Sequence, residues 1–405
     1  MIHSFPYRYD VYTKTYLNVT KPRIRFYSPS YSDIVIYDEV GSEFLIAALD
    51  GEFTFQIMKV RRREINLHPR VLVRLLILVV RLVVKDREID FIRNPLALFE
   101  LALLNTISPK IAVTFIDNSI RFNMLSRIES EMHFLAVQNG FRGPEIAENL
   151  RQHSTRNLFC FGEDTKRRYL QAGCCIDTFS VGGSIKMGLF AERYPHQIEQ
   201  KYDLCWVSQY RPKRFSGGLP GLEKTSLTLL EWIKRITESH QLTLTIAGSA
   251  KSDALDQEVS FYDKIFDLDN VRFVPNNTLD LTSYKTIAES KVTVTVHSTI
   301  GFEMLAAGSK VLFCNFVDDP FYDVPGKDLS QPWILSGAET TFEEFESKLL
   351  SLHNLDEQAW SMQAQPVAQE LVRFSRKEPS TGELRSIFRR WLAEQDESRA
   401  LKSGS

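Results

Sequence analysis

Residues 291–316, KVTVTVHSTIGFEMLAAGSKVLFCNF, decide the fold class. Two β-branched runs, at 291–296 and 311–316, enclose a helical segment that starts at Ile300 and ends before Gly308. Strands that do not alternate between apolar and polar residues are typical of a parallel sheet whose two faces are covered by helices. The stretch therefore predicts one strand–helix–strand unit of an α/β fold.

Strands and helices also alternate upstream of this unit. The sequence predicts strands at 203–208, 242–247 and 271–274, and helices at 222–239, 253–266 and 278–290. Because each strand is followed by a helix, these elements favour a doubly wound parallel sheet. We therefore expect one Rossmann-like domain over residues 201–355.

The first half of the chain repeats this pattern less regularly. Its strand-like runs lie at 33–37, 110–116, 133–137 and 157–161. They predict a second α/β domain over residues 1–200, which a polar linker near 195–201 joins to the next one. Residues 356–394 have helical patterns, and the polar residues 395–405 are expected to form a flexible tail or a linker.

Composition excludes several classes of protein. The 405 residues include 49 Lys and Arg against 51 Asp and Glu, so no overall charge attracts the chain to nucleic acid. Five cysteines without a CxxC spacing argue against a zinc framework and a disulfide scaffold. The N-terminus lacks the short apolar core of a secretory signal. We therefore expect a cytoplasmic protein.

One segment, Val71–Val84, is strongly apolar but contains two arginines. It is shorter than the roughly 20 residues that a membrane-spanning helix needs. As a helix it aligns a basic stripe of Arg70, Arg74, Arg81 and Lys85. One interpretation is a core helix with a solvated basic edge. The other is a helix that lies on an anionic membrane surface, with Arg61–Arg63 just upstream as further cations.

The candidate site follows from the predicted topology. Doubly wound sheets bind ligands beyond the carboxyl ends of their strands, where turns expose backbone amides and helix N-termini. In the second domain the residues at these positions are almost all hydrogen-bonding: Ser208–Arg211, Gly248–Ser249, Pro275–Asn277 and His297–Thr299. Together they favour a polar, phosphorylated ligand.

The most specific signal is the turn that follows His297. Ser298 and Thr299 are placed to cap the next helix and to offer hydroxyls and amides to a phosphate. Gly301 would permit close approach of the backbone, and Glu303 is placed to accept hydrogen bonds from ribose hydroxyls. The alternative is an ordinary capped helix whose Glu303 only interacts favourably with the helix dipole.

Other ligand motifs are absent from the sequence. Residues 217–225 hint at a phosphate loop, but Glu223 stands where the glycine before Lys224 is required. No GxGxxG follows a strand, which weighs against a nicotinamide dehydrogenase, and no HExxH supports a zinc hydrolase. We therefore predict no metal and no cofactor other than a nucleotide-linked substrate.

The segment 297–313 resembles the donor-binding strand and helix of GT-B glycosyltransferases. Further segments resemble the transferases of bacterial surface-carbohydrate biosynthesis, in the order 110–122, 133–143, 157–173, 179–190 and 203–211. The resemblance covers about half of the chain, from 110 to 316. It implies two Rossmann-like domains that face each other across a cleft, with the C-terminal helices packing back toward the first domain.

The resemblance also implies roles for the donor-side residues. The turn Ser208, Gln209, Tyr210 and Arg211, with Lys213 and Arg214 beyond it, would face the donor phosphate. Cations there suit the charge that develops on the leaving group. A solvated run of charges is the alternative. The turn Val274–Asn276 would pack against the base, and His297, Ser298, Thr299 and Glu303 would bind phosphate and ribose.

The first domain is expected to supply the acceptor side and the catalytic carboxylates. Asp117 and Glu163 each follow a strand directly, so one of them would act as general base or as nucleophile. Asp117 as a turn residue and Glu163 as a helix N-terminal acid are the alternatives. Gln138, Asn139 and Lys186 would line the cleft.

The resemblance implies a glycosyltransferase that uses a nucleotide sugar and a lipid-linked glycan, as in O-antigen or capsule synthesis. Some members of this group look like relatives of the retaining β-Kdo transferases, and the cations near the cleft suit a donor with a phosphate and a carboxylate, such as CMP-Kdo. The alternatives are a UDP- or GDP-sugar donor, a nucleotide-sugar 2-epimerase, a polyol-phosphate transferase and a non-catalytic nucleotide-binding module. The expected location is the cytoplasm, at the inner face of the inner membrane if Val71–Val84 contacts lipid.

Overall fold

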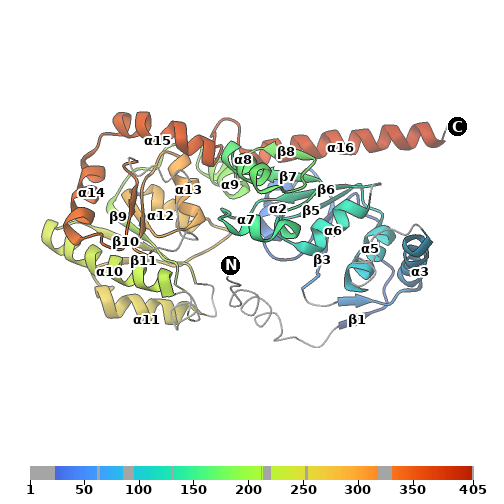
Figure 1. Cartoon of the computed structure of the whole chain (residues 1–405), viewed down its shortest axis with the longest axis horizontal. Helices are drawn as coiled ribbons and strands as arrows, with labels where there is room; N and C mark the ends of the chain where they lie inside the picture. Colours follow the sequence, from blue (N-terminus) through green and yellow to red (C-terminus); the bar gives the residue numbers. More distant parts are fainter. Residues whose placement is uncertain are drawn as a thin grey trace, which may run out of the picture.

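The computed structural model describes residues 23–61, 64–84, 95–129, 131–210, 212, 220–250, 254–317 and 331–403. These residues form two six-stranded parallel sheets, covered by helices, and a two-stranded sheet of β1 (Arg23–Arg25) and β4 (Glu64–Asn66). Figure 1 shows the two large sheets side by side along the longest axis of the molecule. The predicted class, α/β with two Rossmann-like domains, is confirmed.

The second large sheet has the strand order β11-β10-β9-β12-β13-β14, and every pair is parallel. Its strands are β9 (Tyr202–Val207), β10 (Leu244–Ala247), β11 (Arg272–Val274), β12 (Ser290–Thr295), β13 (Lys310–Asn315) and β14 (Ile334–Ser336). This is the order of nucleotide-binding doubly wound folds, with its topological switch point between β9 and β12. Ligands of such folds bind at that point.

Helices join these strands and cover the sheet: α10 (Pro220–His240), α11 (Leu255–Phe266), α12 (Thr282–Ala288), α13 (Thr299–Ala306) and α14 (Phe342–Asn354). The predicted strands of this half are confirmed to within two residues at each end. The start of the helix predicted at 253 lies outside the described residues. Strand β14, with three residues, was not predicted.

The first large sheet has the order β3-β2-β5-β6-β7-β8, also with parallel pairs. Its strands are β2 (Ile34–Tyr37), β3 (Phe55–Met58), β5 (Ile111–Thr114), β6 (His133–Val137), β7 (Asn157–Cys160) and β8 (Thr178–Val181). The edge strand β3 was not predicted, because an edge strand is less buried and carries a weaker apolar pattern.

The helices of the first half are α2 (Ser42–Leu49), α3 (Pro69–Val84), α5 (Pro95–Ile107), α6 (Ile120–Ile128), α7 (Glu145–Glu148), α8 (Glu163–Ala172) and α9 (Ile185–Arg193). Helix α3 packs on α5 at the end of the molecule remote from the second sheet (Figure 1). Among the described residues, no helix combines the length and the apolar character needed to cross a membrane.

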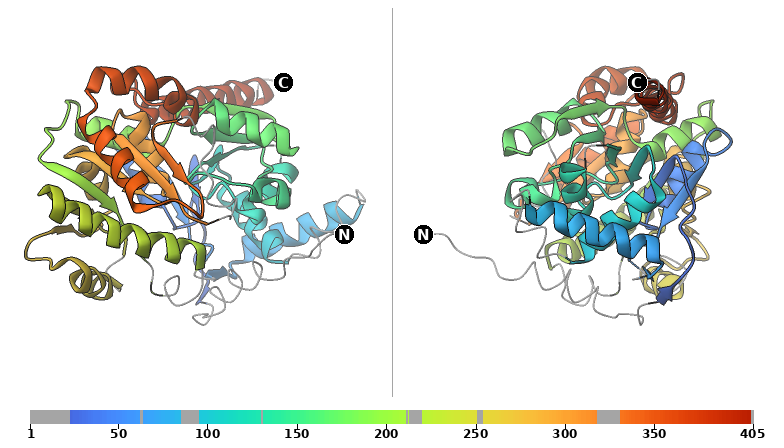
Figure 2. Two further views of the ribbon diagram at one scale, coloured as in Figure 1. Left: turned by 60° about the vertical axis from the view of Figure 1, so that its left-hand side comes forward. Right: turned by 90° about the vertical axis from the view of Figure 1, so that its right-hand side faces the viewer.

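The C-terminal helices return to the first sheet, as predicted. Helix α15 (Glu357–Leu371) contacts α13 of the second half and α8 of the first. Helix α16 (Ser380–Ser403) then packs on α2, α9 and β5, where Leu384, Phe388 and Trp391 join the core that contains β2 (Figures 1 and 2).

The predicted flexible tail at 395–405 is wrong for most of its length. Helix α16 continues to Ser403. Two contacts near the start of this segment join it to the first half of the chain: Lys110 pairs with Asp396 at 2.7 Å, and the Gln395 side chain donates to the backbone oxygen of Glu131 at 3.1 Å. A polar sequence therefore forms a helix here because it is anchored along one side.

Candidate active site at the carboxyl ends of the two sheets

The switch point of the second sheet brings two of the predicted donor residues together. Gln209 follows β9 and His297 follows β12, and the Gln209 side-chain oxygen accepts a hydrogen bond from the His297 backbone amide at 3.1 Å. The His297 ring lies edge-on to Phe302 at 5.7 Å between ring centres. Sequence position alone thus located the expected ligand-binding edge of this sheet.

A buried carboxylate organises the neighbouring turns. Glu258 of α11 accepts hydrogen bonds from the Ser208 hydroxyl at 2.5 Å, from the Ser249 amide at 3.0 Å and from the Ala250 amide at 2.8 Å. The Tyr262 hydroxyl donates to Ser208 at 2.8 Å. The hydroxyl of Ser208 is therefore engaged with protein groups, and its role is to join the turns after β9 and β10.

The remaining donor residues lie around these turns. Tyr210 stacks on Phe261 at 4.8 Å, and its backbone oxygen accepts from the Ser249 hydroxyl. The backbone oxygen of Val274 accepts from the Gly248 amide at 2.9 Å, and Asn276 is partly exposed just beyond it. Arg211, Lys213 and Arg214, the predicted phosphate-facing cations, lie outside the described residues.

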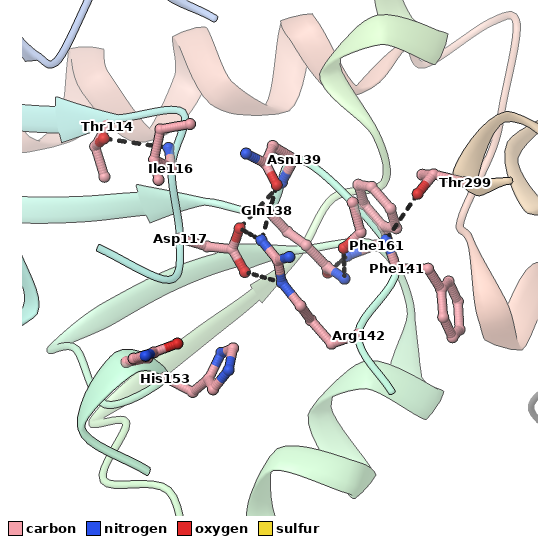
Figure 3. A network of polar contacts seen from close by, with 12 residues as sticks. Thr114, Ile116, Asp117, Gln138, Asn139, Phe141, Arg142, His153, Phe161 and Thr299 are labelled. Atoms are coloured by element: carbon pink, nitrogen blue, oxygen red, sulfur yellow. Dashed lines mark hydrogen bonds and ion pairs between the residues drawn. The ribbon is translucent and has the colours of Figure 1, made fainter. Parts of the chain in front are cut away.

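The turn after β12 contacts the first half of the chain. Ser298 is the N-cap of α13, but its side chain makes no cap hydrogen bond. The Thr299 hydroxyl accepts from the Phe141 backbone amide at 3.1 Å (Figure 3), and the Phe141 ring stacks on Phe302 at 4.3 Å. The Thr299 hydroxyl therefore takes part in a contact between the two halves, and its contact with a phosphate stays a prediction.

Gly301 has a packing role instead of the expected role in phosphate approach. A Cβ there would lie 2.9 Å from the Phe313 ring and 3.0 Å from the Thr295 methyl group. The missing side chain therefore lets α13 lie directly on β12 and β13.

Glu303 is not accessible to a ribose in this structure, which corrects the sequence expectation. Its side chain is buried, and its two oxygens accept hydrogen bonds from the hydroxyls of Ser184 and Tyr284. Burial raises the pKa of Glu303, and the nearby Lys186 partly offsets that effect. A ribose could reach this carboxylate only if the contact between the two halves opened, because the Glu303 side chain is buried.

Lys186 lies in the second position of α9, next to the contact between Ser184 and Glu303 that joins the two halves of the chain. Its ammonium group sits 5.0 Å from the centre of the Phe44 ring and 5.7 Å from that of Phe115. No carboxylate of the described residues lies within ion-pair distance of it. A partly buried cation at a helix N-terminus is a suitable group for binding an anion.

Asp117 cannot act as the accessible base that the sequence suggested. Its side chain is buried, and Arg142 donates to both of its oxygens, with the Arg142 Nε–Oδ2 bond at 2.9 Å (Figure 3). The Tyr169 hydroxyl and the Asn139 amide donate to the same carboxylate at 3.2 and 3.3 Å. Burial lowers and Asp117 raises the pKa of Arg142, which ends well above its ordinary value. Asp117 therefore has no free acceptor position for a substrate proton.

The predicted cleft residues Gln138 and Asn139 also support the loop between β6 and α7. The buried Gln138 amide accepts from the Phe161 backbone at 2.9 Å and donates to the Gly140 oxygen at 3.0 Å. The Asn139 side-chain oxygen accepts from Arg142 at 2.8 Å. These groups fix the loop that carries Phe141 to Thr299, so they shape the junction without facing it (Figure 3).

Glu163 is the exposed member of the predicted carboxylate pair. It begins α8 directly after β7, its side chain is 61% exposed, and it lies 3.6 Å from Lys166. This geometry matches the alternative in which Glu163 is an acid in the first turn of a helix that interacts favourably with the helix dipole. It also leaves the carboxylate open to a bound molecule.

Sequence reasoning missed Glu258, and it placed Ser184 and Arg142 near the cleft without identifying their partners, Glu303 and Asp117. Glu258 could have been found, because it lies four residues before Tyr262 and eight before Phe266 on the buried face of one helix. An acid on an apolar face needs a specific partner. The partners of Ser184 and Arg142 are far away in the sequence, so no local pattern identifies them.

The sequence contains one Asp-x-Asp pair, Asp267 and Asp269. It lies between α11 and β11, so it precedes a strand and sits at the amino edge of the sheet, away from the switch point. In the part of the chain that the structure describes, no group of three or more His, Cys, Asp or Glu side chains is placed to hold a metal ion.

Solved structures with the same fold include a UDP-GlcNAc 2-epimerase from Neisseria meningitidis bound to UDP-GlcNAc. That comparison gives a TM-score of 0.52 at 11% identity and covers 89% of this chain and 99% of that one. The wall teichoic acid polymerase TagF matches with a TM-score of 0.50 at 11% identity, over 96% of this chain and 95% of that one. These likenesses establish the GT-B fold. No curated protein matches the chain in sequence.

One family model matches residues 135–374, more than half of the 405 residues. The match runs from β6 through the Phe141 loop and the switch point to the end of α15. It therefore contains both sides of the junction described above. The description of that family reads "putative O-antigen biosynthesis protein", and the chain belongs to it.

Proposed function

We propose that the protein is a glycosyltransferase that moves a sugar from a nucleotide donor to a lipid-linked glycan during synthesis of a bacterial surface polysaccharide. The observation that carries the proposal is the meeting of the two sheets at their carboxyl ends, through Thr299 with Phe141 and Glu303 with Ser184. In a GT-B fold such a junction lies between a donor-binding and an acceptor-binding domain. The family and the fold both support this class of enzyme.

The donor would bind at the switch point of the second sheet. The turns after β9, β10 and β12 are held together by Glu258 and by the Gln209–His297 hydrogen bond, so their backbone groups are pre-organised. The N-terminus of α13 and the ammonium of Lys186 would stabilise negative charge on the departing phosphate. This arrangement suits transfer without a metal ion, and Arg211 and Lys213 would add cations if they reach the same phosphate.

Glu163 is our candidate for the catalytic carboxylate. It is exposed at the carboxyl end of β7, whereas Asp117 is buried beneath Arg142. A carboxylate in this place would act as general base toward an acceptor hydroxyl, or as nucleophile in a retaining reaction. Asp117 then serves as a positioning residue that holds the loop from Asn139 to Arg142.

The favoured donor is CMP-Kdo, and the favoured acceptor is a glycan on a lipid carrier at the cytoplasmic face of the inner membrane. A donor with both a phosphate and a carboxylate suits a site that contains the cation Lys186, and Arg211 in the sequence would add a second cation if it reaches the donor. UDP- and GDP-sugars are the alternative donors, since they would use the same turns.

The test is an assay of sugar transfer with purified protein and separate CMP-, UDP- and GDP-linked sugars. We expect release of one nucleotide, accelerated by a lipid-linked glycan acceptor, and loss of this activity in Glu163→Gln. Asp177→Asn serves as the control, because that side chain lies in an exposed ion pair with Arg127. If no nucleotide sugar is consumed with any acceptor, the proposal is wrong.

A nucleotide-sugar 2-epimerase is the second candidate, favoured by the similarity to the Neisseria meningitidis enzyme over nearly its whole length. An epimerase needs no acceptor. It would change the configuration of the sugar in the nucleotide sugar and would form no transfer product. Incubation with each sugar nucleotide alone, followed by NMR of the sugar, separates the two activities. A polyol-phosphate transferase, by analogy with TagF, would instead release CMP from a CDP-polyol.

A further inference from the structure

Helix α3 exposes an apolar face that no described part of the chain covers. Its outward residues are between 38% and 65% exposed, and they are Leu72, Val73, Leu76, Ile77 and Val80. Leu72, Leu76 and Val80 are four residues apart, so they form one row, and Val73 and Ile77 lie beside them on the next row. Single exposed aliphatic residues are common on proteins, but five on one helix form a patch.

The opposite face of α3 already has its partner. Val71 and Leu78 are buried in the core that contains α5, and Leu75 and Val79 pack against that core. Figure 2 shows α3 in the foreground of its right-hand view, on the outside of the molecule. The expectation of a core helix therefore holds for the face of α3 that packs against α5. It does not account for the exposed apolar face.

Three arginines follow one border of the apolar face. Arg70, Arg74 and Arg81 are exposed and return to nearly the same angle around the helix, next to Ile77 and between the apolar and the buried faces. No carboxylate of the described residues pairs with them. Arg61, which the sequence analysis added to this basic group, instead pairs with the buried Asp38 at 2.7 Å. Residues 62, 63 and 85 lie outside the described residues.

We infer that α3 is a docking surface for an anionic lipid bilayer, on which it lies parallel to the membrane plane. Its five aliphatic side chains enter the boundary between headgroups and acyl chains, and the three arginines contact lipid phosphates at the rim. Charge complementarity selects this occupant over a second copy of the chain. In a dimer through α3 the partner helix would offer these arginines no counter-charge, because α3 contains no acidic residue.

Exposed aromatic residues also lie near the start of α3. Phe26 and Tyr27 follow β1, which pairs with β4, and the Asn66 side chain donates to the Tyr27 backbone oxygen at 3.0 Å. Both rings are more than half exposed. Aromatic side chains favour the headgroup level of a bilayer. On this surface the proposed enzyme would meet a lipid-linked acceptor. Only this role in meeting the acceptor rests on the proposed function; binding of α3 to a bilayer does not.

Vesicle flotation tests this surface with full-length protein and liposomes of phosphatidylcholine, with or without phosphatidylglycerol. We expect flotation with the anionic vesicles and little with phosphatidylcholine alone. Leu76→Asp should weaken vesicle binding by about tenfold or more. It removes a leucine that would enter the bilayer, and it adds a negative charge that the anionic lipids repel. Arg74→Glu should weaken it by about fivefold or more and make the remaining binding less sensitive to salt.

Matched controls separate this effect from general loss of solubility or fold. Leu170→Asp changes a leucine of similar exposure, 55%, on α8, and Arg390→Glu changes an exposed arginine on α16; both should float like the wild type. Thermal stabilisation by nucleotide should be the same in Leu76→Asp and wild type, so failure of the membrane surface is distinguishable from failure of the proposed function. Equal losses in Leu76→Asp and Leu170→Asp, or no flotation of the wild type, overturn the inference. So does a concentration-dependent dimer that Leu76→Asp abolishes.

Discussion

Ser184, at the start of α9 in the first half of the chain, donates a hydrogen bond to Glu303 of α13 in the second half. Both residues are buried, and Tyr284 donates to the other oxygen of the same carboxylate at 2.6 Å. A carboxylate of one domain therefore lies at the helix N-terminus of the other. The contact therefore joins the two domains through Glu303, the residue that the sequence predicted to bind ribose.

The Ser184–Glu303 contact should be measurable as a coupling energy. Ser184→Ala and Glu303→Gln are each expected to lower the free energy of unfolding, by about 1–3 kcal/mol, because the first removes a donor to a buried carboxylate and the second replaces one of its acceptor oxygens by an NH2 group. The double variant should lose less than the sum of the two, with a coupling of at least about 0.5 kcal/mol. Urea unfolding of the four proteins gives the cycle. Strict additivity would show that the contact contributes nothing.

Glu258→Gln should weaken nucleotide binding while the protein remains folded. The amide keeps one acceptor oxygen but loses the second, so the Ser249 and Ala250 amides and the Ser208 hydroxyl can no longer all be satisfied. We expect the dissociation constant for nucleotide to rise by about tenfold, the effect of roughly one lost charge-assisted hydrogen bond. Isothermal titration checks this. Asp256→Asn, on the same helix, should bind as the wild type does.

Asp117→Asn should destabilise the protein strongly. It removes the negative charge beside the buried guanidinium of Arg142, and breaking a buried ion pair costs about 3–5 kcal/mol. Asp177→Asn, in an exposed pair with Arg127, should cost no more than about 1 kcal/mol. Denaturant unfolding compares the two. Similar losses in both variants would contradict a positioning role for Asp117.

Glu100 should make stability depend on pH. It accepts hydrogen bonds from Tyr37 and Arg121, but burial raises the pKa of Glu100 to about 7 from its ordinary 4.5. Between these values the unfolded chain has released the proton while the folded protein retains it. The contribution of Glu100 to the free energy of unfolding is therefore greatest below pH 4.5, and it falls as pH rises toward 7, by at most about 3 kcal/mol.

Glu100→Gln should remove this part of the pH dependence. Urea unfolding between pH 5 and 8 measures it, with the exposed Glu199→Gln as the matched control. An unchanged slope in Glu100→Gln would show that Glu100 is ionised in the folded protein throughout this range.

The fold was predictable because its signals are local. The runs of apolar and β-branched residues in β9, β10, β12 and β13 are almost entirely buried, so the sequence itself reports their environment. The position of the site followed from topology, since Gln209 and His297 had to meet once β9 and β12 became neighbours.

The orientation of individual side chains was not predictable in the same way. Whether Asp117 points to a substrate or to Arg142 depends on a loop 25 residues away in sequence. Whether Glu303 meets ribose or Ser184 depends on how the two domains pack. These are long-range choices that no strand or helix pattern contains, and both went against the sequence expectation.

Hydrogen exchange with and without saturating nucleotide tests the central claim most directly, namely that a nucleotide sugar binds at the switch point of the second sheet. The nucleotide used is the one that stabilises the protein best among CMP, CDP, UDP and GDP. We predict slower exchange in the turns 208–210, 248–250 and 297–303, with unchanged exchange in the edge strand β8. Binding of that nucleotide without protection of these three turns would contradict the account.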